Sequence, residues 1–129
     1  MLKALAIDYG TKRVGLAVAR GTLADPLAVI PNDEHLFEQL LAIIQTEKIE
    51  QIVIGLSENE MADLTREFAQ DLEAVSGSIP IDFTDETLSS NEVEEKLKEK
   101  GIKKSTRTGP IDHFAAAIIL EQWLENQVD

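Results

Sequence analysis

An acidic side chain near the amino terminus has the setting of a catalytic or metal-binding group. Asp8 ends an apolar run over residues 5–7, and a second apolar run follows a short polar interval. That interval contains Gly10 and two cations, Lys12 and Arg13. Because an ionised carboxylate is costly inside a sheet, the pattern places Asp8 at the rim of a sheet, where a metal ion or a phosphate could meet it.

Three further acids fall at the ends of expected elements: Asp85 and Glu86 after an apolar strand, and Asp112 in the first turn of the last helix. Carboxylates from separate elements can hold two Mg²⁺ or Mn²⁺ ions about 3.5–4 Å apart, an arrangement that hydrolyses phosphodiesters. Side chains alternate along a strand, so Asp85 and Glu86 point to opposite faces and at most one readily faces Asp8. The alternation does not decide which.

Each of these acids also has a plain structural explanation. A carboxylate at the end of a strand is usually just solvated, and Asp112 could serve only to complement the positive end of its helix. A feature of the first strand favours the functional interpretation of Asp8. The small residues Ala4 and Ala6 share its strand face, which predicts space above the carboxylate.

The available donor types favour a hard cation. Mg²⁺ takes oxygen ligands and keeps several waters, so three or four carboxylates suffice to bind it. The chain has no cysteine, and its two histidines, His35 and His113, stand alone in the sequence. Zinc is therefore not expected, and both histidines are expected at the surface.

Cations are unevenly distributed, because half of the 12 Lys and Arg residues lie between residues 96 and 107. Five cations are candidates for contacts with phosphates: Lys12 and Arg13 on the first hairpin loop, and Lys103, Lys104 and Arg107 on the loop before the last helix. The second group could follow a nucleic-acid backbone, although a solvated linker is equally expected.

A chain of 129 residues, with 43% hydrophobic and 28% charged residues, is expected to form one domain, residues 1–129. Its formal net charge of −12 argues against a generic nucleic-acid coat protein, because neutralising phosphates takes cations. The charge does not argue against a nuclease that holds metal ions with carboxylates. No apolar run approaches the roughly 20 residues of a membrane span, and the beginning lacks a signal-peptide pattern. We therefore expect a cytoplasmic protein that does not bind membranes.

Apolar runs and turn signals predict five strands, over residues 3–9, 13–20, 27–30, 52–56 and 79–84. Helices are expected over residues 33–47 with Asp33 as N-cap, over 59–76, over a charged segment from Ser89 or Ser90 to Gly101, and from near Pro110 to the end. Short links predict an antiparallel meander for the first three strands, and helical links predict parallel additions for the last two. The expected fold is α/β, a five-stranded mixed sheet with helices on both faces.

Helical spacing also predicts which side chains each helix buries. The first helix should bury Leu36, Leu40, Ile43 and Ile44. The second should bury Leu64, Phe68, Leu72 and Val75, and the last Ala115, Ile118, Ile119 and Trp123. The small residues Ala115 and Ala116 beside Asp112 predict that the last helix approaches the sheet closely.

Four segments in order resemble the signature segments of the YqgF family, Holliday-junction-resolvase-like bacterial proteins with an RNase H-like fold. Residues 7–15 are similar to the family's opening Asp-x-Gly-x-Lys-Arg-x-Gly pattern, and residues 52–56 to its apolar strand ending in Gly-Leu. Residues 85–90 are similar to its Asp-Glu-Arg-Leu-Thr-Ser segment, and residues 111–120 to its closing Asp-x-x-Ala-Ala helix. The resemblance extends over essentially the whole chain.

The resemblance implies an endonuclease that depends on Mg²⁺ or Mn²⁺, with two ions in its site. The family's usual substrate is the 5′ end of precursor 16S ribosomal RNA, and branched DNA is the older proposal. By position, Asp8, Glu86 and Asp112 would be the catalytic and metal-binding acids, which selects Glu86 over Asp85. The two cations of the first hairpin loop would face the substrate phosphates. A monomer or a homodimer is compatible with the sequence.

Departures from the family pattern keep one other function open. Thr87 stands where the family usually has Arg, residues 57–60 are acidic where it has a proline- and glycine-bearing loop, and residues 103–108 are less basic. These differences favour a binding module that keeps the fold and recruits RNA or a protein. An actin-like ATPase also has Asp-x-Gly-Thr after a strand, but it needs two such domains around a nucleotide cleft.

Overall fold

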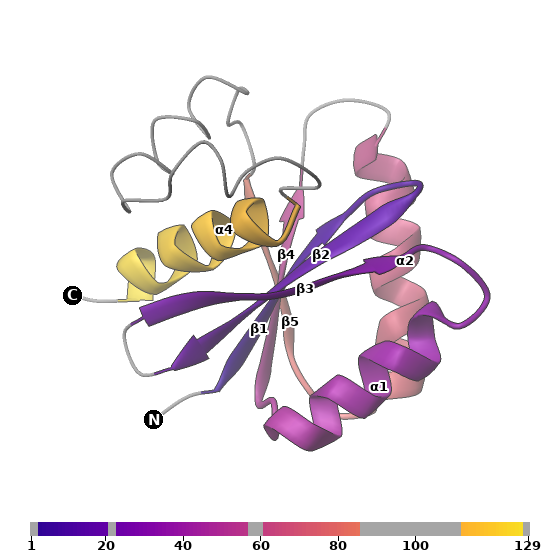
Figure 1. Cartoon of the computed structure of the whole chain (residues 1–129), viewed down its shortest axis with the longest axis horizontal. Helices are drawn as coiled ribbons and strands as arrows, with labels where there is room; N and C mark the ends of the chain where they lie inside the picture. Colours follow the sequence, from indigo (N-terminus) through magenta and orange to yellow (C-terminus); the bar gives the residue numbers. More distant parts are fainter. Residues whose placement is uncertain (1–2, 21–22, 57–60, 86–111, 128–129) are drawn as a thin grey trace.

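The computed structural model describes residues 3–20, 23–56, 61–85 and 112–127 (Figure 1). For Arg20, Asp85 and residues 112–114 and 126–127 it describes the backbone alone. The elements in chain order are β1 (Ala4–Tyr9), β2 (Arg13–Arg20), β3 (Leu23–Pro31), α1 (Leu36–Glu47), β4 (Gln51–Leu56), α2 (Met61–Ser76), β5 (Ile81–Asp85) and α4 (Asp112–Gln127). None of these helices is long and apolar enough to cross a membrane.

The five strands form one mixed sheet in the order β3-β2-β1-β4-β5. β2 pairs antiparallel with both β1 and β3, whereas β1 pairs parallel with β4 and β4 parallel with β5. This confirms the expected meander of three strands and the two parallel additions. Because β1, β4 and β5 run in one direction, their carboxyl ends meet at one edge of the sheet, which we call the carboxyl edge.

Helices cover both faces of the sheet, as expected (Figure 1). α1 and α2 pack on one face, where their buried side chains Leu36, Leu40, Phe68 and Leu72 join the larger apolar cluster. α4 packs on the other face, across β1, β2 and β3. The alternation of β1 divides its side chains between these layers, since Leu5 belongs to the α1/α2 cluster and Ala6 to the α4 cluster.

The contact between α4 and the sheet is built largely from alanines. Six fully buried alanines face one another across it: Ala4, Ala6, Ala17 and Ala19 from the strands, and Ala116 and Ala117 from the helix. Methyl groups let the backbone of a helix approach a sheet more closely than larger side chains do. This confirms the predicted close approach of the last helix, whose side chains Ile118, Ile119 and Trp123 are buried as expected, while Ala115 is only half-buried.

The largest differences from the predicted boundaries are at α1 and β3, and β5 runs over Ile81–Asp85 rather than 79–84. α1 begins at Leu36 rather than near Asp33, and its N-cap is His35, which makes no capping side-chain bond. The Asp33 carboxylate instead accepts a hydrogen bond from the His35 backbone N–H at 2.9 Å, which forms a turn before the helix. β3 runs over Leu23–Pro31 rather than 27–30, because an edge strand with an irregular register tolerates Pro26.

The buried face of α2 also differs from the prediction. Phe68 and Leu72 are buried, but Leu64 and Val75 are 42% and 49% exposed. The buried stripe instead includes Ala62, Thr65 and Ala69. The apolar residues expected to form one face therefore extend beyond the part of the helix that the sheet covers. The predicted charged helix from Ser89 or Ser90 to Gly101 lies outside the described residues.

Replacing a contact alanine beneath α4 should destabilise the fold. Ala6→Leu adds three carbons at a position with no exposed surface, which forces strain or displaces α4 and should cost about 1–3 kcal/mol of unfolding free energy. Urea unfolding of the parent and variant measures the difference. Ala74→Leu, on the exposed side of α2, is the matched control and should stay within about 0.5 kcal/mol of the parent. Equal stability of Ala6→Leu and the parent would contradict the close approach of α4.

Candidate functional site

Asp8 lies at the carboxyl edge, near the end of β1, and is half-buried. Its position in the strand alternation matches that of Ala4 and Ala6, which face α4. Asp8 therefore belongs to the sheet face covered by α4, opposite to the larger apolar core. This placement agrees with the prediction that the carboxylate stands at the rim of the sheet.

Two glycines, rather than the predicted Ala4 and Ala6, leave backbone without a side chain beside Asp8. Ala4 and Ala6 do share its face, but α4 covers both of them. The cross-strand partner of Asp8 on β2 is Gly15. On β4, the pairing of Ile7 with Ile54 makes Gly55 the next residue in register. Glycine has no side chain to occupy the space beside its partner, so neither of these two strand positions puts a side chain next to Asp8.

α4 begins at the same edge and on the same face. Its first residue is Asp112, and Figure 1 shows the start of α4 beside the arrowheads of β4 and β5. The far half of the helix lies toward the beginning of β5, because the Trp123 indole N–H donates a hydrogen bond to the Asp82 carboxylate at 3.2 Å. The helix therefore runs away from the carboxyl edge, with its N-terminal turn toward the end of β1.

The predicted catalytic set is thus only partly within the described residues. Asp8 is described, the backbone of Asp112 is described without its side chain, and Glu86 lies outside. Three of the predicted substrate-binding cations, Lys103, Lys104 and Arg107, also lie outside the described residues. Among the described residues, no three His, Cys, Asp or Glu side chains form a group that could hold a metal ion.

A short loop beside Asp8 carries the two remaining predicted cations. Lys12 and Arg13 are both exposed. Gly10 makes the turn compact, because a Cβ at that position would lie 2.6 Å from the Arg13 carbonyl oxygen. Exposed cations at the site edge of an acidic chain are suited to hold phosphates.

The sequence did not predict that Asn32 binds this loop. The Asn32 side-chain amide donates a hydrogen bond to the Gly10 carbonyl oxygen at 2.7 Å, and the Asn32 backbone N–H donates one to the Lys12 carbonyl oxygen at 2.9 Å. Its only sequence signal is an asparagine directly after an apolar strand, a position where such side chains commonly bond to turns. Gly10 and Asn32 are 22 residues apart in the chain, so sequence spacing gave no indication of this hydrogen bond.

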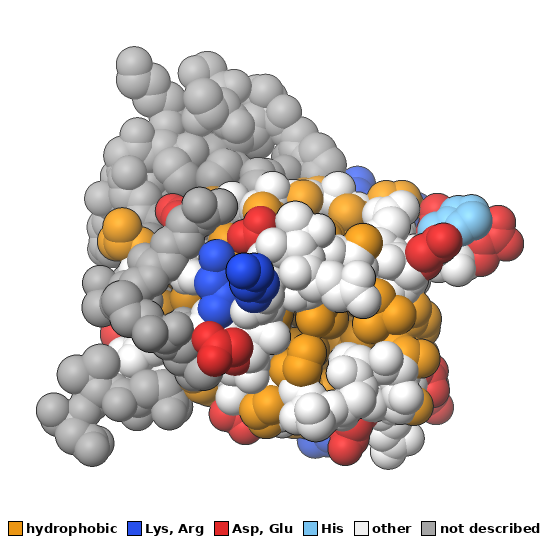
Figure 2. Space-filling view, turned by 90° about the horizontal axis from the view of Figure 1, so that it is seen from below, with side chains coloured by type: hydrophobic (Ala, Val, Ile, Leu, Met, Phe, Trp, Pro, Cys, Tyr) orange, Lys and Arg blue, Asp and Glu red, His pale blue; other side chains and the backbone are white. Residues whose placement is uncertain are grey.

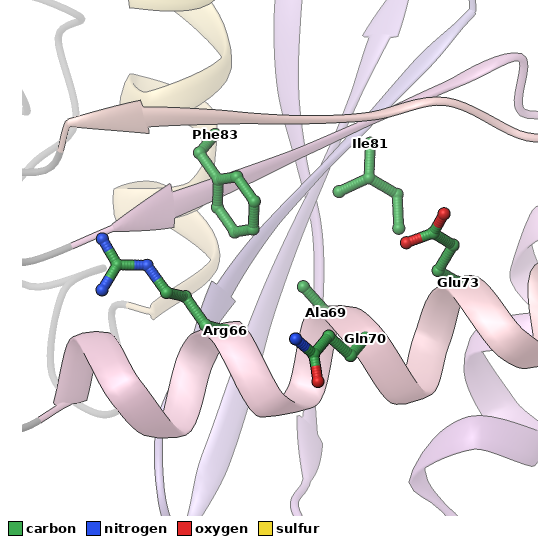
Figure 3. A pocket seen from close by; sticks show the side chains of 6 residues that line it. All are labelled: Arg66, Ala69, Gln70, Glu73, Ile81 and Phe83. Atoms are coloured by element: carbon green, nitrogen blue, oxygen red, sulfur yellow. The ribbon is translucent and has the colours of Figure 1, made fainter.

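Two pockets are lined by described residues on the α1/α2 side of the sheet. One of about 150 Å³ includes Tyr9, Asn32 and Phe68 in its lining, and the rings of Tyr9 and Phe68 stack with centroids 4.4 Å apart. Another, of about 220 Å³, lies between α2 and β5, with Ile81 and Phe83 pointing toward the helix (Figure 3). Both are separated from the face of Asp8 by the sheet.

The described histidine has the surface position that was predicted. The His35 ring lies 3.5 Å from the Glu34 carboxylate and 3.3 Å from that of Glu38, and its side chain is 58% exposed. In the space-filling view the histidine stands at the margin of the molecule among acidic side chains (Figure 2). His113 has no described side chain.

Comparison with known proteins links this architecture to nucleases. A family model described as "RuvX: Holliday junction resolvase" matches residues 2–126. A protein of Maridesulfovibrio salexigens named as a candidate pre-16S rRNA nuclease is 42% identical, over 95% of this chain and 98% of that protein. One of the same name from a Sulfurihydrogenibium species is 37% identical, over 97% of this chain and 91% of that protein.

Solved structures of junction resolvases share the fold. Thermus thermophilus RuvC in complex with a Holliday junction superposes with a TM-score of 0.68 at 15% identity, covering 98% of this chain and 96% of that one. Fowlpox virus resolvase with its junction DNA superposes with a TM-score of 0.66 at 9% identity, covering 99% of this chain and all of that one. At such identities the likeness concerns the fold alone, which is of the RuvC-like RNase H type.

Gly10→Ala should distort the loop that carries the two cations. The added Cβ meets a backbone oxygen that cannot rotate away, so we expect a loss of more than about 1 kcal/mol in unfolding free energy. Chemical unfolding measures it. Thr11→Ala, exposed in the same loop, is the control and should change stability by less than about 0.5 kcal/mol. Equal stability of Gly10→Ala and Thr11→Ala would contradict the close approach of Gly10 to the Arg13 carbonyl oxygen.

Proposed function

The chain belongs to the RuvX (YqgF) family of nucleases, and we propose that it is a metal-dependent endonuclease that cleaves precursor 16S ribosomal RNA at its 5′ end. The proposal rests on one observation: Asp8 and the start of α4, whose first residue is Asp112, share one face and one edge of the sheet. Relatives at 36–42% identity over nearly the full chain carry the name of a pre-16S rRNA nuclease. We take residues 1–129 as a single nuclease domain.

We infer that Asp8, Glu86 and Asp112 hold two Mg²⁺ or Mn²⁺ ions and are the catalytic acids. The register of β5 supports Glu86 over Asp85. Asp82 of β5 is on the α4 face, because its carboxylate binds the indole of Trp123. Glu86 has the same parity in the strand pattern as Asp82, and Asp85 has the opposite parity. All three proposed donors are carboxylates, whose oxygens suit a hard divalent cation.

The proposed roles follow from the chemistry of phosphodiester hydrolysis. Bound divalent ions would activate water and stabilise the leaving oxygen. The three carboxylates fix where the ions bind, and the glycines beside Asp8 leave backbone rather than side chains next to that position. Lys12 and Arg13 would bind substrate phosphates and set the register of the nucleic acid on the sheet edge. Lys103, Lys104 and Arg107 would extend that contact.

Branched DNA is the alternative substrate. It is favoured by the description of the matching family model as a Holliday junction resolvase. A binding module without activity is the other alternative, supported by the threonine at position 87 and the acidic segment 57–60. A ribosomal RNA substrate would place the protein in the cytoplasm. A monomer and a homodimer are both compatible with the proposed function.

Asp8→Asn should abolish cleavage without unfolding the protein. Losing even an outer partner of a metal ligand typically costs about 10–100-fold, so loss of the ligand itself should cost more than about 100-fold. The assay is Mn²⁺-dependent cleavage of a precursor 16S rRNA fragment, with a four-way DNA junction in parallel. Asp71→Asn, an exposed acid of α2, is the matched control.

The outcomes of this assay separate the three functions. Cleavage of the RNA alone supports rRNA processing, and cleavage of the junction alone supports the resolvase alternative. Absence of cleavage by the parent, together with RNA binding that ignores Mn²⁺, supports the binding module. Equal cleavage by Asp8→Asn and the parent excludes the proposed site.

Lys12→Ala should weaken RNA binding and make it less sensitive to salt. If Lys12 neutralises one phosphate of a single strand, the slope of log K against log salt concentration falls by about 0.7. Fluorescence titration of a labelled precursor RNA fragment over a range of salt measures the slope. Arg66→Ala, an exposed cation of α2, should leave it unchanged. An unaltered slope for Lys12→Ala would remove this residue from the substrate contacts.

A further inference from the structure

The loop from Gly10 to Lys12 lies beyond the paired residues of its own hairpin. The β1–β2 ladder ends with Tyr9 opposite Val14, and Arg13 pairs with Pro31 of β3. Thr11 and Lys12 are exposed. An exposed loop of this kind loses much conformational entropy when it adopts one shape, so it needs hydrogen bonds from outside the hairpin to hold it.

Asn32 supplies such hydrogen bonds from the residue after β3. Its side-chain amide binds the Gly10 carbonyl at 2.7 Å, and its backbone N–H binds the Lys12 carbonyl at 2.9 Å. The two bonds reach carbonyls on either side of Thr11. They therefore fix the backbone from which the Lys12 side chain projects.

The position of Asn32 separates it from Asp8. Asn32 is half-buried and lines the pocket of about 150 Å³ that also includes Tyr9, on the α1/α2 side of the sheet. Asp8 belongs to the opposite face. Asn32 thus acts on the site edge through the loop backbone and not through the space above Asp8.

The chemistry of the bond explains why an amide is suited to this position. The acceptor is a carbonyl oxygen, so the partner must donate, and the Nδ2 of asparagine does. Aspartate would present an oxygen to the Gly10 carbonyl instead. The backbone bond to Lys12 is available to any residue except proline, so a substitution at position 32 removes the side-chain bond selectively.

We propose that Asn32 is a positioning residue for substrate binding: it holds the Gly10–Lys12 loop so that Lys12 and Arg13 meet the phosphates of the nucleic acid. The inference rests on the proposed function, because it assumes that these two cations contact the substrate. It adds a residue that no sequence motif indicates and that does not touch the substrate itself.

The test compares Asn32→Ala with the parent in two measurements. Binding of a labelled precursor 16S rRNA fragment is titrated in metal-free buffer over a range of salt, and cleavage kinetics are measured with Mn²⁺. We expect affinity to fall about 3- to 10-fold, the range for loss of one hydrogen bond. The salt slope should become shallower, and KM should rise with kcat nearly unchanged, as for a loss of uniform binding. A merely structural defect would not alter the salt slope.

Two controls support the comparison. Gln70→Ala removes an exposed amide of α2 that lines the separate pocket between α2 and β5, and it should behave like the parent. Thermal unfolding checks that Asn32→Ala is folded at the assay temperature. If it is not, Asn32→Leu replaces it, because it keeps the approximate size of the side chain and removes the donor without adding a charge.

A double-mutant cycle with Lys12→Ala/Arg13→Ala decides whether Asn32 acts through the loop cations. Support requires that Asn32→Ala causes little further loss of affinity in that background. An equal loss in both backgrounds overturns the proposal, as does unchanged binding by Asn32→Ala. If Lys12→Ala/Arg13→Ala binds like the parent, the positioning role also falls. The proposed nuclease activity is then judged separately by Asp8→Asn.

Discussion

The close contact between α4 and the central strands is the constraint on which the candidate site depends. Alanines on both sides of this contact let the helix lie near the backbone of β1 and β2. The distance from the start of α4 to the end of β1 is set by that contact, and so is the separation of the groups that these ends carry. The Trp123–Asp82 hydrogen bond fixes the other half of the helix over the sheet. A metal site made of side chains from separate elements requires such a rigid arrangement.

The alternation of a single strand then assigns structure and function to different faces. Leu5 and Ile7 are fully buried in the larger core, which the α1 and α2 helices complete. Asp8 falls on the other face, where its neighbours across the sheet are glycines and the covering helix begins. The larger apolar core lies on one side of the sheet, and the candidate site lies on the other, at the end of the α4 contact. A shift of register by one residue would bury Asp8 in the larger core and expose an apolar residue at the edge.

Electrostatics poses a second constraint, because a chain with a net charge of −12 must approach a polyanion. The placement of the exposed cations beside Asp8 therefore matters for binding. The loop that carries Lys12 and Arg13 is compact at Gly10 and is held from β3 by Asn32. Fixing a cation before binding lowers the entropy that is lost when the substrate arrives. The exposed pair of Arg66 with Asp63, in contrast, lies within one turn of α2.

Much of this architecture could be predicted from the sequence, because short-range periodicity encodes it. The five strands, their mixed pairing and the position of Asp8 at a strand end follow from alternation and turn residues. The extent of β3, the start of α1 and the exposure of Leu64 and Val75 did not, because they depend on which neighbours cover each segment. The placement of Gly55 beside Asp8 and the bond from Asn32 to Gly10 bring together residues far apart in the chain. The sequence by itself determined which residue types are available for metal and phosphate chemistry. Only the tertiary structure decided which of them stand side by side, because strand register and helix packing bring distant positions together.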